Sequence, residues 1–241
     1  MSDLWQQTPE SLNLSSDHID VWLCHLKDLS SDINEFYNLL SDDERDRADK
    51  LKVEDKRRQY IITRGTLRRR LALLTNIDPE DFVFEYLKQG KPVLTNDPRY
   101  VDTTLNVSHS NEFALIAISR KHHIGVDIEK IDPDSNPNKL VTRFFSKAEQ
   151  SEFRALPEAI RAKAFCACWT RKEAFIKAIG DGITYGLDTF DVTVDPEVQR
   201  PEINLLKHSE EIWSVINLPI NDEYMACLAS NGDNINVRYW R

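Results

Sequence analysis

The strongest constraint on the fold is a repeated order of elements, in which a long helix is followed by a short strand of alternating character. Apolar spacing predicts that Ser41 caps a charged stretch that continues as a helix to Leu74, ahead of a half-buried strand at 82–86. A second helix over 159–179, ended by glycines, precedes a strand at 190–194. The repeat indicates a duplicated α+β unit.

Such a duplication predicts an α+β protein with an N-terminal half, residues 1–119, and a C-terminal half, residues 120–241. The functional site is then expected in the cleft between the halves. Further short apolar runs are typical of strands. These expected strands cover residues 21–24, 104–107, 113–119, 124–129 and 223–229.

Charge and apolar patterning exclude several classes of protein. The chain has 241 residues, with 31 Lys and Arg against 40 Asp and Glu, which gives a net charge of −9. This balance disfavours a nucleic-acid partner, because the protein repels phosphate over most of its surface. The N-terminal residues lack a signal-peptide pattern, and no apolar run approaches the roughly 18 residues of a membrane span. We therefore expect a cytoplasmic protein with no membrane partner.

One segment departs from the acidic balance. Residues 44–70 hold 11 basic side chains against 5 acidic ones, so the net charge of the segment is 11 − 5 = +6. Lys56, Arg57, Arg64 and Arg68 exceed what the local acids can pair, which indicates an anion site. The alternative interpretation is a solvated helix face held by ion pairs between residues four apart.

The run G-V-D-I-E at 125–129 places two carboxylates on one face of an expected strand. Because side chains alternate along a strand, Asp127 and Glu129 share a face while the residues between them point to the core. Two such carboxylates repel each other unless a cation or a proton lies between them. Mg²⁺ is commonly bound by one or two carboxylates together with substrate phosphates. The alternative is an edge strand with a solvated acidic face.

The second helix carries a charged pair at the edge of its apolar side. Glu173 and Lys177 are four residues apart and therefore lie side by side on the helix. Glu173 could reach a metal held by the acidic strand, and Lys177 could hold a phosphate oxygen. The alternative is an ordinary surface pair of glutamate and lysine.

Two more segments hold residues suited to a ligand. The run N-V-S-H-S at 106–110 ends an expected strand and offers a hydroxyl, an imidazole and turn amides. The run Q-G-K-P at 89–92 is a turn in which glycine allows a close backbone approach and lysine adds a charge. Each segment is equally well explained as a structural turn.

Together, four motifs resemble one enzyme family. The order Q-G-K-P, N-V-S-H-S, G-V-D-I-E and W-x-x-K-E-A-F-I-K-A-I-G, the last at 169–180, is similar to that of the 4′-phosphopantetheinyl transferases of the surfactin-synthetase-activating type. The resemblance implies a pseudo-twofold monomer of two α+β halves, of which the C-terminal half carries the metal site. It also implies transfer of 4′-phosphopantetheine from coenzyme A to a serine of an apo acyl or peptidyl carrier protein, with release of adenosine 3′,5′-bisphosphate.

The resemblance assigns roles to individual residues. It implies that Asp127, Glu129 and Glu173 hold Mg²⁺, or Mn²⁺ in its place, on the pyrophosphate of coenzyme A. Glu173 would be the base for the serine hydroxyl, directly or through water, and Lys177 would stabilise the charge that develops on the pyrophosphate. The residues expected around the adenine and the phosphates are Gly90, Lys91, Pro92, Ser108 and His109, with Arg47, Arg57 and Arg64 completing the phosphate cradle.

Two other functions compete with this hypothesis. Residues 127–130 also match the D-x-E-K pattern of metal-dependent nucleases, although the charge of −9 is wrong for DNA. A non-enzymatic alternative is a module that binds coenzyme A or a carrier protein without catalysis.

Overall fold

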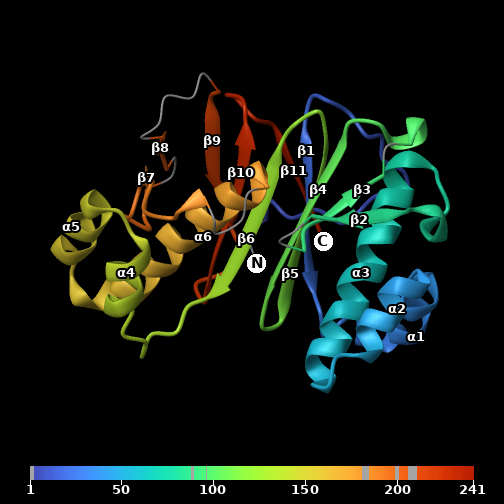
Figure 1. The fold of residues 1–241 in the computed structure, drawn as a ribbon, viewed down its shortest axis with the longest axis horizontal. Coiled ribbons are helices and arrows are strands. Elements are labelled where there is room, and N and C mark those ends of the chain that lie inside the picture. Colours follow the sequence, from blue (N-terminus) through green and yellow to red (C-terminus); the bar gives the residue numbers. More distant parts are fainter. Residues whose placement is uncertain (1–2, 88–89, 96, 181–184, 199–200, 206–210) are drawn as a thin grey trace.

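The first half of the chain begins with a strand, continues with helices and a hairpin, and closes with two further strands (Figure 1). In this computed structural model the described residues are 3–241, apart from 88–89, 96, 181–184, 199–200 and 206–210. Gln89 of the Q-G-K-P motif therefore lies outside the described residues, as does Gly182, one of the glycines predicted to end the second helix. The elements of the first half are β1 (Ile19–His25), α1 (Ile33–Leu39), α2 (Asp42–Asp49), α3 (Glu54–Thr75), β2 (Phe84–Tyr86), β3 (Pro92–Leu94), β4 (Thr103–Ser110) and β5 (Phe113–Arg120).

The second half repeats the same order of elements. Its sheet has the strand order β6-β10-β9, which matches the order β1-β5-β4 of the first half. In both halves a long helix is followed by a two-stranded hairpin, as the sequence predicts. The elements are β6 (Ile124–Lys130), α4 (Asn138–Phe144), α5 (Lys147–Ala155), α6 (Arg161–Ile179), β7 (Phe190–Val192), β8 (Ile203–Leu205), β9 (Trp213–Asn217) and β10 (Tyr224–Asn231), with β11 (Val237–Trp240) at the end. The predicted α+β fold of two similar halves is confirmed.

A buried ion pair recurs in each half at the corresponding place. Glu44 of α2 accepts from Arg68 of α3 at 2.8 Å, and Glu149 of α5 accepts from Lys172 of α6 at 2.7 Å. Both glutamates belong to capping boxes. Each basic side chain also donates to carbonyl oxygens of the segment before the following hairpin, and Lys172 donates to the first residue of β7 as well. The duplication therefore extends to side chains that fix each long helix to the rest of its half.

The two sheets pack against each other, and helices cover their outer faces. A central apolar core joins side chains of β1 and β5 to side chains of β6 and β10. Separate cores lie between α3 and the first sheet and between α6 and the second. Figure 1 shows the helices on the two outer flanks and the strands between them. No helix in the described ranges is both long and apolar enough to cross a membrane.

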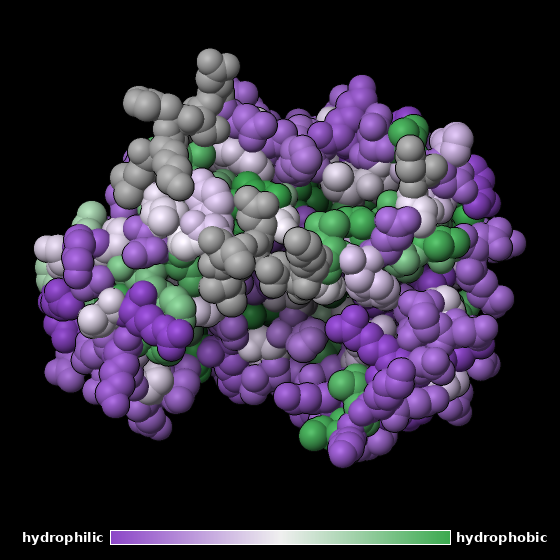
Figure 2. Space-filling model, in the orientation of Figure 1, coloured by the Kyte–Doolittle hydropathy of each residue, from purple (hydrophilic) through white to green (hydrophobic). Residues whose placement is uncertain are grey.

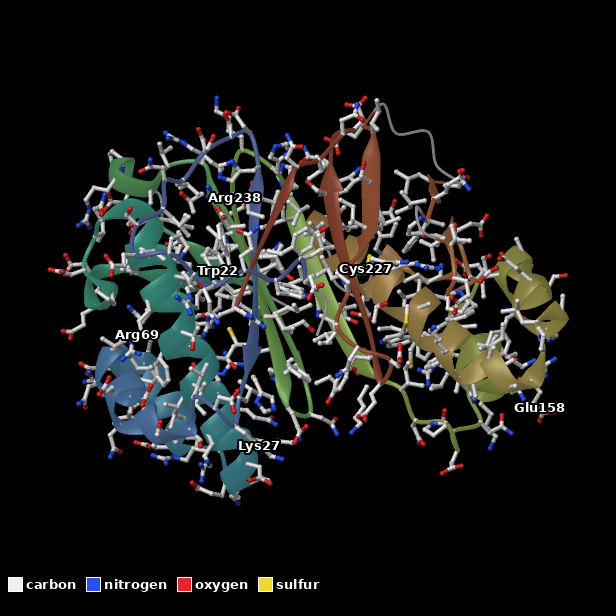
Figure 3. The ribbon with its side chains drawn as sticks, turned by 180° about the vertical axis from the view of Figure 1, so that it is seen from behind. Trp22, Lys27, Arg69, Glu158, Cys227 and Arg238 are labelled. Atoms are coloured by element: carbon white, nitrogen blue, oxygen red, sulfur yellow. The ribbon has the colours of Figure 1, made fainter. Side chains whose placement is uncertain are left out.

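The last strand returns to the first half. β11 pairs in parallel with β1, from Ile19 opposite Val237 to Trp22 opposite Trp240 (Figure 3). Buried Asp20 holds this strand, because its carboxylate accepts two bonds of 2.7 Å from the guanidinium of Arg238 and one from the Trp240 indole. The division into residues 1–119 and 120–241 stays a prediction. β11 belongs to the second of these segments but pairs with the sheet of the first half.

Candidate active site

A cleft of about 360 Å³ lies where β4 of the first half faces β6 and α6 of the second half. It is lined by Val107, Ser108, His109, Asp127, Glu129, Trp169, Glu173 and Lys177. Six of the residues proposed from the sequence thus share one hollow, and the two halves supply opposite walls of it. Figure 2 shows that this face of the molecule is largely hydrophilic, with hydrophobic residues gathered around the β2–β3 hairpin.

Gly125 allows the acidic strand to lie directly against the second helix. A Cβ atom at this position would be 2.0 Å from the carbonyl oxygen of Ala174 and 2.5 Å from the amide nitrogen of Ala178. Both contacts are with backbone atoms, so neither can be relieved by rotating a side chain. The first letter of G-V-D-I-E therefore sets the separation between the carboxylates of β6 and the charged pair of α6.

Asp127 is the buried centre of the polar network. Its Oδ1 accepts from the Lys177 ammonium at 2.6 Å and from the Ser108 hydroxyl at 2.9 Å. Lys177 also donates to Ser108 at 3.1 Å and to the carbonyl oxygen of Val126 at 3.2 Å. The second carboxylate oxygen, Oδ2, is buried and has no hydrogen-bond partner among the residues that the structure describes. Asp127 therefore has one oxygen engaged and one oxygen available.

Two half-buried glutamates share the cleft with Asp127. Burial, and then the negative charge of Asp127, raise the pKa of Glu129. The same two causes, in the same order, raise the pKa of Glu173. The Glu129 carboxylate accepts a hydrogen bond of 3.2 Å from the Ser110 hydroxyl. Three carboxylates thus repel one another here, and Lys177 is the cation that lies among them.

The donor set suits a hard divalent cation that binds with its substrate. Across the described ranges, no group of three or more His, Cys, Asp or Glu side chains is arranged so that it could hold a metal ion alone. Mg²⁺ rarely uses an all-protein cage, and commonly takes one or two carboxylates together with waters and substrate phosphates. The unpartnered Oδ2 of Asp127 and the repulsion among the carboxylates are what such an ion would relieve. The residues present therefore fit Mg²⁺ on a phosphorylated substrate.

His109, on the wall formed by β4, lies within electrostatic range of two lysines. Desolvation by the surrounding protein, and then the positive charge of Lys177, lower the pKa of the exposed His109 imidazole. The positive charge of Lys56, on α3, acts in the same direction. Lys56 is exposed, and within the described ranges no carboxylate forms an ion pair with it. Lys177 and His109 therefore line this part of the cleft with Lys56 within electrostatic range, which suits an anion.

The turn that contains Gly90, Lys91 and Pro92 borders a second hollow of about 220 Å³ next to the cleft. The Lys91 ammonium does not point into open space, because it donates to the backbone carbonyl oxygens of Lys177 and Ile124. Burial, and then the charge of Lys177, lower the pKa of Lys91 to about 8. Lys91 therefore binds the end of α6 and the start of β6, which carry the polar residues of the cleft.

The three arginines proposed from the sequence lie outside the lining of the cleft. Arg57 pairs with Asp49 at 3.0 Å. Arg64 is buried, 3.5 Å from a buried glutamate of α2 and 3.2 Å from the Tyr86 hydroxyl. Arg47 is exposed, with its guanidinium 5.6 Å from the centre of the Tyr86 ring. Arg57 and Arg64 thus already have acidic partners, whereas Arg47 lies over the rings of Tyr60 and Tyr86.

The sequence reasoning missed the use of two polar residues of β4 and of an aromatic wall. Asn106 and Ser110 bond to β6, and Trp169 of α6 lines the cleft one helical turn before Glu173. The signal for the first two was available, since Asn106, Ser108 and Ser110 alternate along a strand and so share one face.

Two family models match the chain. The model of the 4′-phosphopantetheinyl transferase superfamily matches residues 123–229, and the model of the 4′-phosphopantetheinyl transferase N-terminal region matches residues 27–121. The two matches meet near the turn between β5 and β6, so each corresponds to one half of the fold.

Two curated proteins and one solved structure are also similar to the chain. The 4′-phosphopantetheinyl transferase HetI of Nostoc sp. is 32% identical over 238 residues, which cover 98% of this chain and 97% of HetI. The 4′-phosphopantetheinyl transferase Sfp of Bacillus subtilis is 30% identical over 172 residues, 71% of this chain and 74% of Sfp. A solved holo-(acyl-carrier-protein) synthase of Bacillus anthracis, in complex with coenzyme A (3′,5′-ADP), is 19% identical with a TM-score of 0.39, and covers 45% of this chain and 94% of its own.

Proposed function

The chain belongs to the 4′-phosphopantetheinyl transferase superfamily, and on that basis we propose that it transfers 4′-phosphopantetheine from coenzyme A to a serine of an apo acyl or peptidyl carrier protein. The other product is adenosine 3′,5′-bisphosphate. The observation that carries the proposal is the convergence of Asp127, Glu129, Glu173 and Lys177 on one cleft between the two halves.

The reaction needs little covalent chemistry from the protein. The serine oxygen forms a bond to the phosphorus that bears pantetheine, while the bond from this phosphorus to the bridging pyrophosphate oxygen breaks. Transfers of this kind depend on positioning and on stabilisation of charge on the phosphate oxygens. A site must therefore supply a base for the hydroxyl proton and cations for the pyrophosphate.

The carboxylates of the cleft suit the role of a base for the hydroxyl proton and the binding of a metal ion. Glu173 is proposed to take the serine proton, directly or through water, because its half-buried carboxylate lines the cleft beside Asp127 and Lys177. Asp127 and Glu129, with Glu173, are proposed to hold Mg²⁺. When bound, this ion would neutralise charge on the pyrophosphate.

The basic groups suit the second requirement. Lys177 is proposed to donate to a pyrophosphate oxygen from its place beside Asp127, where its ammonium is already oriented by Ser108. Ser108 and His109 are proposed to bind the phosphate end of coenzyme A, with Arg47 as a further cation.

The remaining predicted ligands lie beside the cleft or outside its lining. Gly90, Lys91 and Pro92 are proposed to line the hollow that takes the adenine, which adjoins the cleft through Lys177. Arg57 and Arg64 each have an acidic partner, with which a phosphate would have to share the guanidinium group.

The lysine of the competing nuclease pattern makes its contacts outside the cleft. Lys130 completes the D-x-E-K pattern, but its ammonium pairs with Glu223 at 3.2 Å and lies over the Tyr224 ring. Among the described residues, Lys130 is also absent from the lining of the cleft.

We also propose that a single chain acts as a monomer, since both walls of the cleft come from one molecule. Action in the cytoplasm, without nucleic acid or membrane, stays an expectation from the sequence.

The experiment mixes the protein, coenzyme A and an apo acyl carrier protein, and follows adenosine 3′,5′-bisphosphate by chromatography. We expect release that requires the apo carrier and Mg²⁺ and that stops in EDTA. Release without the carrier would indicate hydrolysis instead of transfer. Binding of coenzyme A with no release, for several unrelated carriers, would support a module without catalysis.

A further inference from the structure

β4 and β6 lie side by side although they belong to different sheets. β4 is the edge strand of the first sheet and β6 is the edge strand of the second. Both strands are described in full, and no backbone ladder joins them. The outward N–H groups of an edge strand need acceptors when they are buried. The junction between the halves therefore has to satisfy these groups in another way.

Side chains of β4 supply acceptors for two of the outward N–H groups of β6. The Asn106 side-chain oxygen accepts from the backbone N–H of Val126 at 2.9 Å, and the Ser110 hydroxyl oxygen accepts from the N–H of Lys130 at 3.1 Å. Each bond joins a residue to the one 20 positions later, so the two strands run parallel in one fixed register. Both side chains are buried, with 3% of Asn106 and 9% of Ser110 exposed.

The two bonds lie on either side of the acidic residues. Val126 precedes Asp127, and Lys130 follows Glu129. Between the two bonds, the Ser108 hydroxyl donates to Asp127 at 2.9 Å. Ser110 contributes twice, because its hydroxyl also donates to Glu129 at 3.2 Å.

We propose that Asn106 and Ser110 are positioning residues that fix β6 against β4, and so hold Asp127 and Glu129 opposite Ser108 and His109. The proposal rests on the proposed function for its effect on catalysis. A slip of one residue would turn Asp127 toward the core, because side chains alternate along a strand. With no backbone ladder between the strands, these side chains carry the register.

The consequence concerns a ligand that spans both strands. Coenzyme A would contact β4 through its phosphate end and β6 through the metal carboxylates. Loss of the register bonds should therefore weaken the coupling between Mg²⁺ and coenzyme A more than it weakens binding to either strand alone. A residue that only stabilised the fold would lower the melting temperature without changing this coupling.

The test uses variants that remove the bonds and variants that keep them. Asn106→Leu and Ser110→Ala each remove an acceptor, whereas Asn106→Asp and Ser110→Thr retain one. Thr104→Val is the matched control, because Thr104 also lies on β4 but donates to the His122 carbonyl, away from the cleft. The measurements are backbone amide exchange, calorimetry of coenzyme A with and without Mg²⁺, and transfer rates well below the melting temperature.

We expect slow exchange of the Val126 and Lys130 amides in the natural protein, and selective loss of protection at Val126 in Asn106→Leu. We also expect the combined Asn106→Leu, Ser110→Ala variant to lose at least about tenfold in kcat and most of the Mg²⁺-dependent gain in coenzyme A affinity. Ser110→Thr and Thr104→Val should keep both.

Two results would overturn the positioning role. One is fast exchange of both amides in the natural protein. The other is an unchanged kcat and an unchanged Mg²⁺-dependent affinity in the combined variant, while the natural protein is active. Absence of transfer by the natural protein would instead count against the proposed function, and the amide exchange would still decide whether the register bonds exist.

Discussion

Replacement of Gly125 by alanine is expected to separate the acidic strand from the second helix. The added Cβ would lie 2.0 Å from the Ala174 carbonyl oxygen, and real Cβ contacts essentially never fall below 3.0 Å. The strand and the helix must therefore move apart by about 1 Å, since the obstructing atoms belong to the backbone. Overpacking of this kind costs about 1–3 kcal/mol of unfolding free energy.

The shift acts directly on the proposed reacting groups. Asp127 lies two residues after Gly125, and Glu173 and Lys177 adjoin the obstructing residues of α6. A misplacement of about 1 Å in a catalytic site can reduce the rate about 100-fold. For Gly125→Ala we therefore expect a kcat about 100-fold lower, with a melting temperature lower by about 2–4 °C for each kcal/mol lost.

The assay compares transfer rates with thermal unfolding, and Gly65→Ala provides the control. A Cβ at Gly65 would lie 2.5 Å from the Phe36 side chain, in the packing of α1 on α3 and away from the cleft. This variant should lose stability while its kcat stays near that of the natural protein. The reasoning is refuted if folded Gly125→Ala transfers phosphopantetheine within threefold of the natural rate.

Three further predictions concern other parts of the molecule. Lys172→Met leaves buried Glu149 without its cationic partner and should cost about 3–5 kcal/mol in urea unfolding, whereas Arg68→Met should cost less, because Arg64 stays 3.5 Å from Glu44. Only Lys172→Met, on the helix that carries Glu173, should lower kcat, and equal rate losses would contradict this. The pKa of Lys91 is about 8 in the folded protein and near its usual 10.5 in the unfolded chain, so the unfolded chain binds more protons between these two pH values. The free energy of unfolding should therefore rise with pH in this range, and Lys91→Met should abolish the rise. Asp20→Asn should weaken bonds to β11 and speed amide exchange at residues 237–240, and unchanged exchange would show that Asp20 does not hold the strand.

The second helix and its neighbours were predicted well because their signals are local. Gly180 ends α6 in a left-handed conformation with φ of 81°, which the glycine itself indicates. The capping box at Ser41 is likewise local and is present. Between α2 and α3, however, the predicted helix is interrupted over residues 50–53. No glycine or proline marks the break, and the structure turns there while Glu44 of α2 pairs with Arg68 of α3.

Long-range pairing explains what the sequence reasoning missed. β11 was not predicted, because its place is set by a parallel pairing with β1 more than 200 residues away. The duplication was visible only as an order of elements, since one half uses arginine and the other lysine in the equivalent ion pair.

Part of the candidate site could be read from alternation and helical spacing. These place Asp127 with Glu129, and Glu173 with Lys177, and the structure brings the two pairs to one cleft. The acidic partners of Arg57 and Arg64 could not be predicted from the sequence, because these ion pairs depend on how α2 packs on α3. Local periodicity cannot specify which acid a buried guanidinium will meet.

The most direct measurement is the intact mass of an apo acyl carrier protein after incubation with coenzyme A, Mg²⁺ and either the natural protein or Glu173→Gln. Glu158→Gln is the matched control, because Glu158 is an exposed glutamate outside the cleft (Figure 3). We expect the natural protein and Glu158→Gln to add one phosphopantetheine group, and Glu173→Gln to be slower by about 100-fold or more, as for loss of a general base. Transfer by Glu173→Gln at the natural rate would contradict the proposed role of the cleft, and failure of the natural protein to bind coenzyme A or modify any carrier would contradict the proposed function itself.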